Sequence, residues 1–323
     1  MSVNPATLKR IEDAHRFGAV YRGYLANHLP MALIALDHMG ASDATLGRFE
    51  DAYLESHLEP IGKDPAFQAA VEGFEVRIAR AGTVYVLREE IDRLAAGFGS
   101  GAFHGAIRTA YATQSGSDRE VAHALAYWTR AFEPLPEPPE LTGHQTPLEV
   151  LAAISRDPPF AKRPPGKNIA ERLQNAAKDA SFRELVAQVD RAKLSMASLA
   201  AALVRAYAAS SDFTVLHGIT GTHAFRLLAE HSSEPGRAIA HLWQAVVAAY
   251  VGAGSPAVEG VALPGSDALD WPEIRARAIQ CRDEHDVKLV YSCWYEGEYY
   301  GDDLYRRVAS SVVCHALRET VDC

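Results

Sequence analysis

Apolar residues recur at helical spacing along most of this chain, and no segment shows the strict alternation of a half-buried strand. In the stretch 83–94, for example, Val84, Leu87, Ile91 and Leu94 are separated by three, four and three residues, which places them on one face of a helix. Similar patterns between residues 5 and 317 predict roughly a dozen helices. We therefore predict an all-α fold, formed as one large multi-helix domain over residues 1–323.

The composition excludes several classes of binding partner for such a fold. Hydrophobic residues make up 48% of the chain, enough to bury a large core, and the net charge of -9 argues against a nucleic-acid surface. No apolar run approaches the roughly 20 residues of a membrane-spanning helix, and the N-terminus lacks a signal-peptide core. The cysteines form no C-x-x-C pair, which predicts free thiols in a cytoplasmic protein without membrane partners; they are Cys281, Cys293, Cys314 and Cys323.

Residues 133–168 contain nine of the 17 prolines around one short helical piece, Leu148 to Ile154. Such a segment is either a linker between two domains or an ordered covering loop. If histidines from both sides of it meet at one centre, a covering loop on a single domain is favoured.

Most common catalytic motifs are absent, including H-E-x-x-H, G-x-S-x-G, the P-loop and the dinucleotide-binding turn. What remains is a set of 13 histidines. Six of them lie near charged or turn residues and are interpreted as surface or cap residues: His15, His38, His57, His144, His231 and His315.

Four other histidines, His28, His104, His217 and His285, lie in apolar or small-residue segments that are predicted to face the interior. Imidazole nitrogens of this kind suit Fe(II), Zn or Cu. Shared metal binding and ordinary packing in the core are both compatible with this pattern.

His285 and Lys288 are three residues apart in a stretch, 271–295, that is predicted to be one helix, so their side chains share a face. An inward lysine has to be paired with an acid, deprotonated or chemically modified, because burying an unpaired ammonium is costly. The alternative is that Lys288 extends to the surface or pairs with Glu284, and that His285 is a satisfied core histidine.

Four segments carry a resemblance to a known family: Asn27–Ala41 (NHLPMALIALDHMGA), Phe103–Tyr111 (FHGAIRTAY), Leu216–Thr220 (LHGIT) and Asp283–Leu289 (DEHDVKL). In this order they resemble the successive landmarks of the questin oxidase-like family. The resemblance implies a helical fold that encloses a non-haem iron held by four histidines and a carboxylated lysine. It also implies oxidative ring opening of an anthraquinone-like substrate, by Baeyer-Villiger oxidation or by dioxygenation.

Carried onto this chain, the resemblance makes His28, His104, His217 and His285 the nitrogen ligands of Fe(II), and Lys288 the modified lysine. Dioxygen and a small aromatic molecule would be the substrates, with NADPH or another external reductant as a possible requirement. Met31 and Arg108 stand where fungal members often carry further histidines, so the substrate pocket is expected to differ.

Two further residues are candidates for catalysis. Arg108, one turn after His104, is placed to orient a phenolate or carboxylate, the alternative being an ion pair with a surface acid. His223 also stands in reserve as a nitrogen ligand. Aromatic residues expected to line the pocket, unless they are plain core, are Tyr24, Phe103, Tyr111, Phe213, Phe225, Tyr291 and Trp294.

Two rival functions remain open from the sequence. In the first, the same site holds zinc and activates water for hydrolysis. In the second, the chain is a helical binding protein without chemistry, and its histidines are packing residues.

Overall fold

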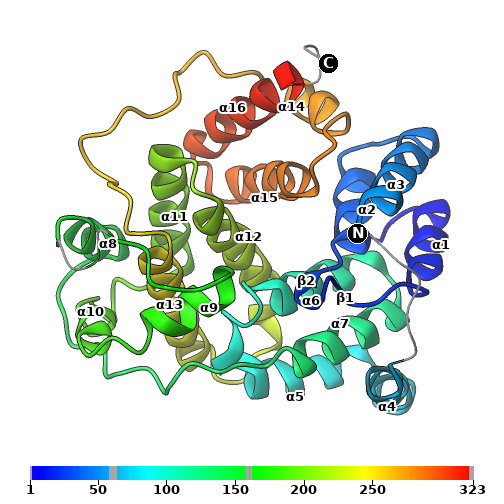
Figure 1. Ribbon diagram of the computed structural model, residues 1–323, viewed down its shortest axis with the longest axis horizontal. Helices are drawn as coiled ribbons and strands as arrows, with labels where there is room; N and C mark the ends of the chain where they lie inside the picture. The colour runs from blue at the N-terminus through cyan, green and yellow to red at the C-terminus, as the bar shows by residue number, and fades with distance from the viewer. Residues whose placement is uncertain (1, 58–63, 158–159, 161, 320–323) are drawn as a thin grey trace. The chain divides into compact units, whose positions relative to one another are not determined.

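A computed structural model describes residues 2–57, 64–157, 160 and 162–319, and it confirms the all-α prediction (Figure 1). The described helices are α1 (Pro5–Ala14), α2 (Leu29–His38), α3 (Asp43–His57), α4 (Pro65–Ala81), α5 (Thr83–Leu94), α6 (His104–Ser115), α7 (Asp118–Arg130), α8 (Pro147–Ser155), α9 (Ile169–Ala176), α10 (Phe182–Ala187), α11 (Met196–Ser210), α12 (Phe213–Leu228), α13 (Pro235–Gly252), α14 (Trp271–Ala278), α15 (Glu284–Tyr300) and α16 (Asp303–Glu319), with 3-10 turns η1 (Ala95–Gly97) and η3 (Ala229–His231).

The local sequence explains where several of these helices begin and end. Helix α2 starts directly after His28, with Pro30 in its first turn, where a missing N–H costs nothing. Gly40 adopts a left-handed φ of 96° just after the helix ends. At the start of α12, the Asp212 carboxylate accepts hydrogen bonds from two backbone N–H groups of the first turn.

The prediction of one continuous helix over 271–295 is wrong. Helix α14 ends at Ala278, and α15 begins only at Glu284. The Asp283 side chain accepts a hydrogen bond from the His285 N–H, so it caps a new helix instead of continuing the previous one. The spacing of His285 and Lys288 still holds, because both lie within α15.

A short antiparallel hairpin was not predicted. Strands β1 (Val20–Tyr21) and β2 (Leu25–Ala26) pair through a turn at Arg22 and Gly23, both with positive φ. Strands of two residues are too short to show an alternating pattern, so only the turn glycine signalled them.

The described chain divides into two compact units. Unit 1 consists of Met1–Leu87, Ile107–Arg130 and Ser266–Cys323; unit 2 consists of Arg88–Ala106 and Ala131–Gly265. The boundary falls inside α5 and inside α6, and both units are assembled from separated stretches of chain. That residues 1–323 form a single domain stays a prediction.

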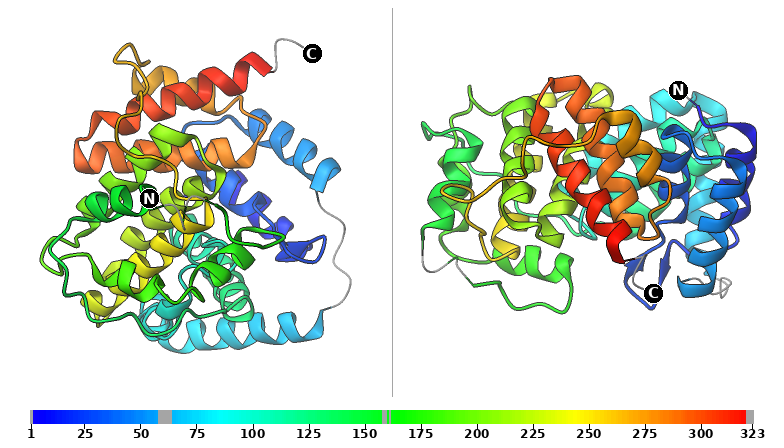
Figure 2. Two further views of the ribbon diagram at one scale, coloured as in Figure 1. Left: turned by 60° about the vertical axis from the view of Figure 1, so that its left-hand side comes forward. Right: turned by 90° about the horizontal axis from the view of Figure 1, so that it is seen from above.

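Within unit 1, α15 packs against α2 on one side and against α16 and α14 on the other. Figure 2 shows α15 and α16 running beside one another in orange and red. Helix α15 thus contacts three other helices, and its residues Val287, Leu289 and Val290 are inaccessible to solvent. Side chains on α15 are therefore held from several directions.

Within unit 2, α12 packs between α11 and α13, and α13 also contacts α9. The Pro-rich segment belongs to this unit and is hydrogen bonded to it. The Gln244 side chain donates to the Pro136 carbonyl, and Ser100 exchanges two hydrogen bonds with the Glu133 backbone. The predicted helical piece is present as α8, whereas Pro158 and Pro159 lie outside the described residues.

Two histidines that were interpreted as surface or cap residues, His15 and His231, are buried. His15 is buried because its Nε2 lies 2.7 Å from a carboxylate oxygen of Glu120, which is itself fully buried on α7. Cys281, Cys293 and Cys314 are free thiols, and Cys323 lies outside the described residues. None of the described helices is long and apolar enough to cross a membrane.

Candidate metal centre

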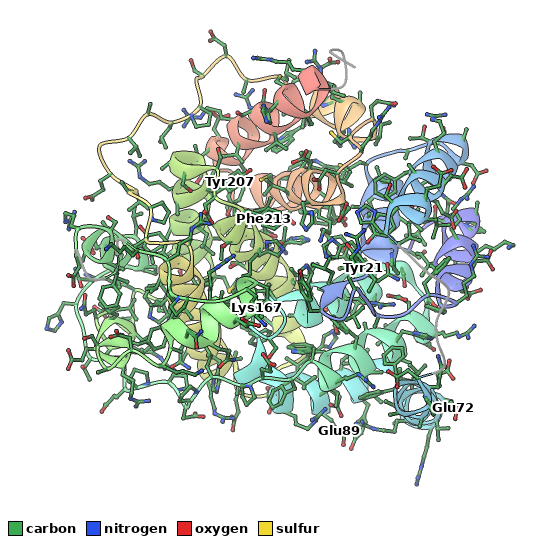
Figure 3. All side chains as sticks on the ribbon, viewed as in Figure 1. Tyr21, Glu72, Glu89, Lys167, Tyr207 and Phe213 are labelled. Carbon is green, nitrogen blue, oxygen red and sulfur yellow. The ribbon has the colours of Figure 1, made fainter. Side chains whose placement is uncertain are left out.

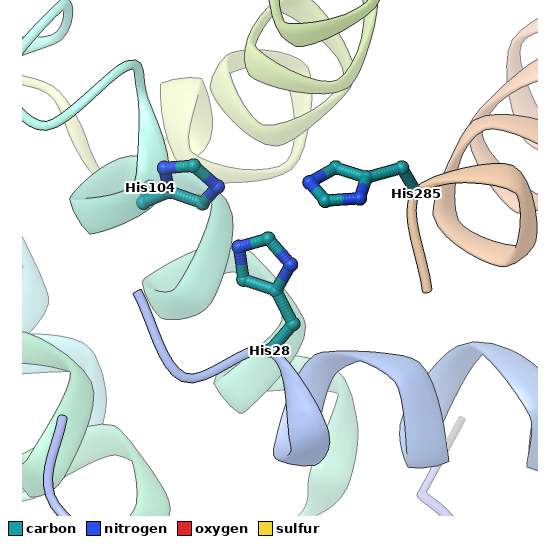
Figure 4. A group of neighbouring side chains, drawn as sticks. All are labelled: His28, His104 and His285. Atoms are coloured by element: carbon teal, nitrogen blue, oxygen red, sulfur yellow. The ribbon is translucent and has the colours of Figure 1, made fainter. Parts of the chain in front are cut away.

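In unit 1, His28 and His285 face one another. Their ring centroids are 4.6 Å apart at an interplanar angle of 80°, and Figure 4 shows the two side chains reaching inward from the start of α2 and of α15. His28 is almost fully buried, while His285 is partly exposed. Residues separated by more than 250 positions are thus brought into contact by the packing of α2 on α15.

A single buried carboxylate lies between these two imidazoles. Oε1 of Glu284 is 3.2 Å from Nδ1 of His28 and 3.5 Å from Nδ1 of His285. Nδ1 of His285 is also 3.0 Å from Oδ1 of Asp283. Carboxylates in these positions accept hydrogen bonds from the Nδ1–H groups, so the lone pair of each imidazole is on Nε2.

The backbone of His28 is fixed as well. Its N–H donates to the hydroxyl oxygen of Tyr53 on α3, at 2.9 Å. Burial raises the pKa of that hydroxyl far above its ordinary value, so Tyr53 stays neutral. The hydrogen bond to the neutral Tyr53 hydroxyl therefore holds His28 at the N-terminus of α2.

Lys288 lies one turn after His285 and only 1% of its surface is exposed. Burial lowers the pKa of its amine to about 8, and the negative charges of Glu284 and Asp283 only partly oppose this shift. Among the described residues, none forms an ion pair or hydrogen bond with Nζ. Lys288 therefore neither reaches the surface nor forms a direct ion pair with Glu284, and its lowered pKa makes the neutral amine accessible near pH 8.

In unit 2, His104 and His217 form a second pair. Their ring centroids are 5.0 Å apart at 72°. Nδ1 of His104 is 2.6 Å from the Gly101 carbonyl oxygen, and Nδ1 of His217 is 2.8 Å from the Phe213 carbonyl oxygen. A carbonyl oxygen can only accept, so both Nδ1 atoms carry a proton and both lone pairs are on Nε2.

The backbone before His104 has an unusual conformation. Gly101, Ala102 and Phe103 all have positive φ, of 54°, 58° and 67°. Left-handed conformations cost about 1–3 kcal/mol each for residues other than glycine, so tertiary contacts must hold this turn. The ring of Phe103 supplies such a contact, because it packs against Gly221 on α12 so closely that a Cβ there would lie 2.7 Å from Cδ1.

The two pairs share one chemical feature. In each of the four histidines, Nδ1 lies against a backbone carbonyl or a carboxylate. Metal-binding histidines usually donate their second ring N–H in this way, which fixes the tautomer and directs Nε2 toward the ion. The donor set therefore fits a metal with nitrogen ligands such as Fe(II) or Zn, and the buried Lys288 amine beside His285 is a site at which an oxygen ligand can be built.

Arg108 and His223, the two candidate catalytic residues, lie in different surroundings. Nε and Nη2 of Arg108 donate to the two carboxylate oxygens of Glu120, at 2.8 and 3.1 Å, and both residues are buried. Burial alone would raise the pKa of Glu120, but the Arg108 charge and the hydrogen bonds from His15 and Arg108 lower it to about 2. His223 is fully buried on α12, six residues after His217 and therefore on another face of that helix. Their catalytic roles stay predictions.

The aromatic residues predicted to line a pocket differ in their exposure to solvent. Tyr24 and Phe213 are exposed, with 61% and 50% of their surface accessible. Phe213, at the start of α12, still contacts His217 with a ring-centroid distance of 4.8 Å, and Figure 3 labels it near Tyr207 of α11. Trp294 is intermediate. The others are buried: Phe103, Tyr111, Phe225 and Tyr291.

Sequence reasoning missed two residues that hold this site, Glu284 and Tyr53. Glu284 was considered only as a partner for Lys288, although its place directly before His285 in a first helical turn was a usable signal. Tyr53 offered no signal, because its contact with His28 depends on how α3 packs against α2.

The model of one known protein family matches most of this chain. A search of the curated proteins finds no match. The sequence model of the family described as questin oxidase-like matches residues 25–293, which include both histidine pairs and Lys288. On the strength of that match over most of its length, the chain belongs to the questin oxidase-like family.

Proposed function

We propose that the His28–His285 pair and the His104–His217 pair bind one metal ion together with carboxylated Lys288, and that the protein is a metal-dependent oxygenase of aromatic polyketide metabolism. The family name supports an oxidase. The observation that carries the proposal is that Nδ1 of each of the four imidazoles lies against a hydrogen-bond acceptor.

Lys288 has the environment that carboxylation requires. Only a neutral amine adds carbon dioxide, and the product is a carbamate and one proton. Because burial lowers the pKa of Lys288 to about 8, a substantial fraction of the amine is neutral near pH 7 to 8. The carbamate oxygen would then be a hard ligand for Fe(II) beside the imidazoles.

When bound, the iron would supply the site for dioxygen activation. The protein's own residues have other tasks. Glu284 and Asp283 keep the imidazoles of unit 1 in one tautomer, and carbonyl groups do so in unit 2. Phe213, half exposed on His217, is the candidate to stack on an aromatic substrate.

Two outcomes are compatible with this proposal and differ in their electron balance. In a dioxygenation, both oxygen atoms enter the product and no external electrons are needed. In a Baeyer-Villiger oxidation, one oxygen atom enters the product, the other becomes water, and a reductant such as NADPH supplies two electrons. We therefore expect either no consumption of NADPH or one molecule for each molecule of product.

The first test is metal analysis of protein purified without added metal, combined with measurement of dioxygen uptake. We expect iron, and we expect His28→Ala and His217→Ala each to lower the bound metal at least tenfold. His241→Ala is the matched control, because His241 is equally buried in α13 but is not in either pair. Full occupancy by zinc with no oxygen uptake would support the hydrolase instead. If the wild type and the variants all contain no bound metal, only the non-catalytic binding protein is left.

A further inference from the structure

A buried tyrosine lies one helical turn beyond Lys288. Tyr291 is inaccessible to solvent, and its hydroxyl oxygen is 2.7 Å from Nδ1 of His38, the last residue of α2. The same hydroxyl donates a hydrogen bond to Oε1 of Gln114 on α6, at 3.0 Å. All of these residues belong to unit 1. No step of the proposed function uses this cluster.

The hydrogen bonds allow the phenolic proton of Tyr291 to move to His38. Nε2 of His38 is buried without a hydrogen-bond partner, so nothing else fixes the tautomer of the ring. With the Gln114 amide as placed, its Oε1 accepts the phenolic hydrogen bond and Nδ1 of His38 is the donor toward the hydroxyl. A half-turn of the amide exchanges its oxygen and nitrogen. With the amide N–H toward Tyr291, the phenol donates its proton to Nδ1 of His38, which is then the acceptor.

Tyr291 and His38 are both neutral at ordinary pH. Burial, together with the neighbouring tyrosines, raises the pKa of Tyr291 far above its usual value. Burial likewise lowers the pKa of His38 below the ordinary value for histidine. A phenol in this position does not ionise alone, but removing an electron from it makes its proton strongly acidic, and a neutral imidazole stands ready to accept it.

The ring of Tyr291 also touches other aromatic rings. Tyr295 is the nearest, with a centroid distance of 4.8 Å, and is half-buried; Tyr111 lies at 5.4 Å and is fully buried. Trp294 lies at 6.4 Å under the Arg275 guanidinium, whose positive charge opposes oxidation of the indole. The contact that leads from Tyr291 toward the surface is therefore Tyr295.

We propose that Tyr291 and His38 form a redox-active pair, in which Tyr291 gives up one electron while its phenolic proton passes to Nδ1 of His38, with Tyr295 as the relay to the surface. The purpose of the pair would be to exchange single electrons with the metal site at the neighbouring turn of α15, and in this respect the inference rests on the proposed function.

The step balances without any further group. Neutral tyrosine and neutral histidine become a tyrosyl radical and an imidazolium, and one electron leaves to a one-electron oxidant. In the working protein, that oxidant would be an oxidised metal ion held by the histidines and Lys288. A one-electron reductant at the surface returns the electron through Tyr295, and the proton moves back from His38 to the phenolate oxygen.

The pair can be tested in the metal-free protein, so that the result does not depend on the oxygenase proposal. A photogenerated ruthenium(III) polypyridyl complex serves as the oxidant, and the radicals are trapped by freezing and recorded by electron paramagnetic resonance. We expect a neutral tyrosyl radical in the wild type that is lost in Tyr291→Phe. His38→Gln keeps a hydrogen-bond acceptor but no base, and we expect the yield of this radical to fall at least tenfold.

Tyr250→Phe is the matched control, because Tyr250 is buried and its hydroxyl donates to the Pro256 carbonyl, which is not a base. It should leave the radical unchanged, whereas Tyr295→Phe should slow its formation. A signal that survives Tyr291→Phe, or an equal yield in His38→Gln, overturns the proposal. Should His38→Gln not fold, electron–nuclear double resonance on the wild-type radical decides, since ¹⁵N-labelled histidine must then couple to it.

Discussion

Replacing Lys288 by methionine should stabilise the metal-free protein while it removes the metal site. Lys288 is 1% exposed, and burial lowers its pKa from 10.5 to about 8. A difference of one pKa unit corresponds to about 1.4 kcal/mol, so the protonated lysine destabilises the folded protein by about 3 kcal/mol at pH 7. Methionine has a similar length and needs no charge partner, so Lys288→Met should recover most of this free energy of unfolding.

The sign of this effect depends on pH in a defined way. The folded-state pKa of Lys288 is lowered, so the unfolded chain binds the proton more tightly, and stability rises as the pH rises from about 8 to 10.5. Below about pH 8 the penalty is fully present, and above 10.5 both states are deprotonated and the penalty disappears. The two proteins should therefore differ most at pH 7 and approach one another near pH 10.5.

The assay is urea unfolding of the metal-free proteins in buffer depleted of carbon dioxide, at pH 7 and at pH 10.5. Lys178→Met is the control, because Lys178 is exposed and should change stability by less than about 0.5 kcal/mol. Equal or lower stability of Lys288→Met at pH 7 would refute the reasoning, since the amine would then have a partner. In the metal-loaded protein the order should reverse, with Lys288→Met losing metal affinity by about 10–100-fold.

Three further results are expected. Gly221→Ala should cost about 1–3 kcal/mol and weaken metal binding through Phe103, whereas Gly218→Ala, whose Cβ meets only the two methyl groups of Leu203, should cost less; thermal unfolding and metal titration compare them. His123→Leu should shift acid unfolding to lower pH, because burial, with the charges of His15 and Arg108, lowers the pKa of His123 to about 3 and protonation penalises the folded state increasingly below pH 6.5; circular dichroism across pH 3–6 measures it. With ¹⁸O₂, dioxygenation should place two labelled atoms in the product and Baeyer-Villiger oxidation one, and a product without label would contradict both.

The elements that the sequence predicted well are those with local signals. Helix α5 has the predicted bounds, and the helical piece predicted within the Pro-rich segment is present as α8. The break between α14 and α15 was missed because the apolar pattern continues across it, and only the capping carboxylate of Asp283 indicates a new helix.

Contacts between distant segments could not be predicted in the same way. His15 looked like a surface residue because its sequence neighbours are polar, but its partner Glu120 lies 105 positions away on α7. The same holds for the Glu284 carboxylate between His28 and His285, since α2 and α15 meet only in the folded unit. The residue types of the candidate site were readable from the sequence, whereas the groups that orient them were not.

The interleaving of the two units sets the order in which the histidine pairs can form during synthesis. Unit 2 contains no residue beyond 265, so the contact between His104 and His217 needs none of the C-terminal helices. Unit 1 needs residues from both ends of the chain, and His28 has to wait for α15. A nascent protein would therefore bring together two of its five proposed ligands first and the other three, including Lys288, only as translation finishes.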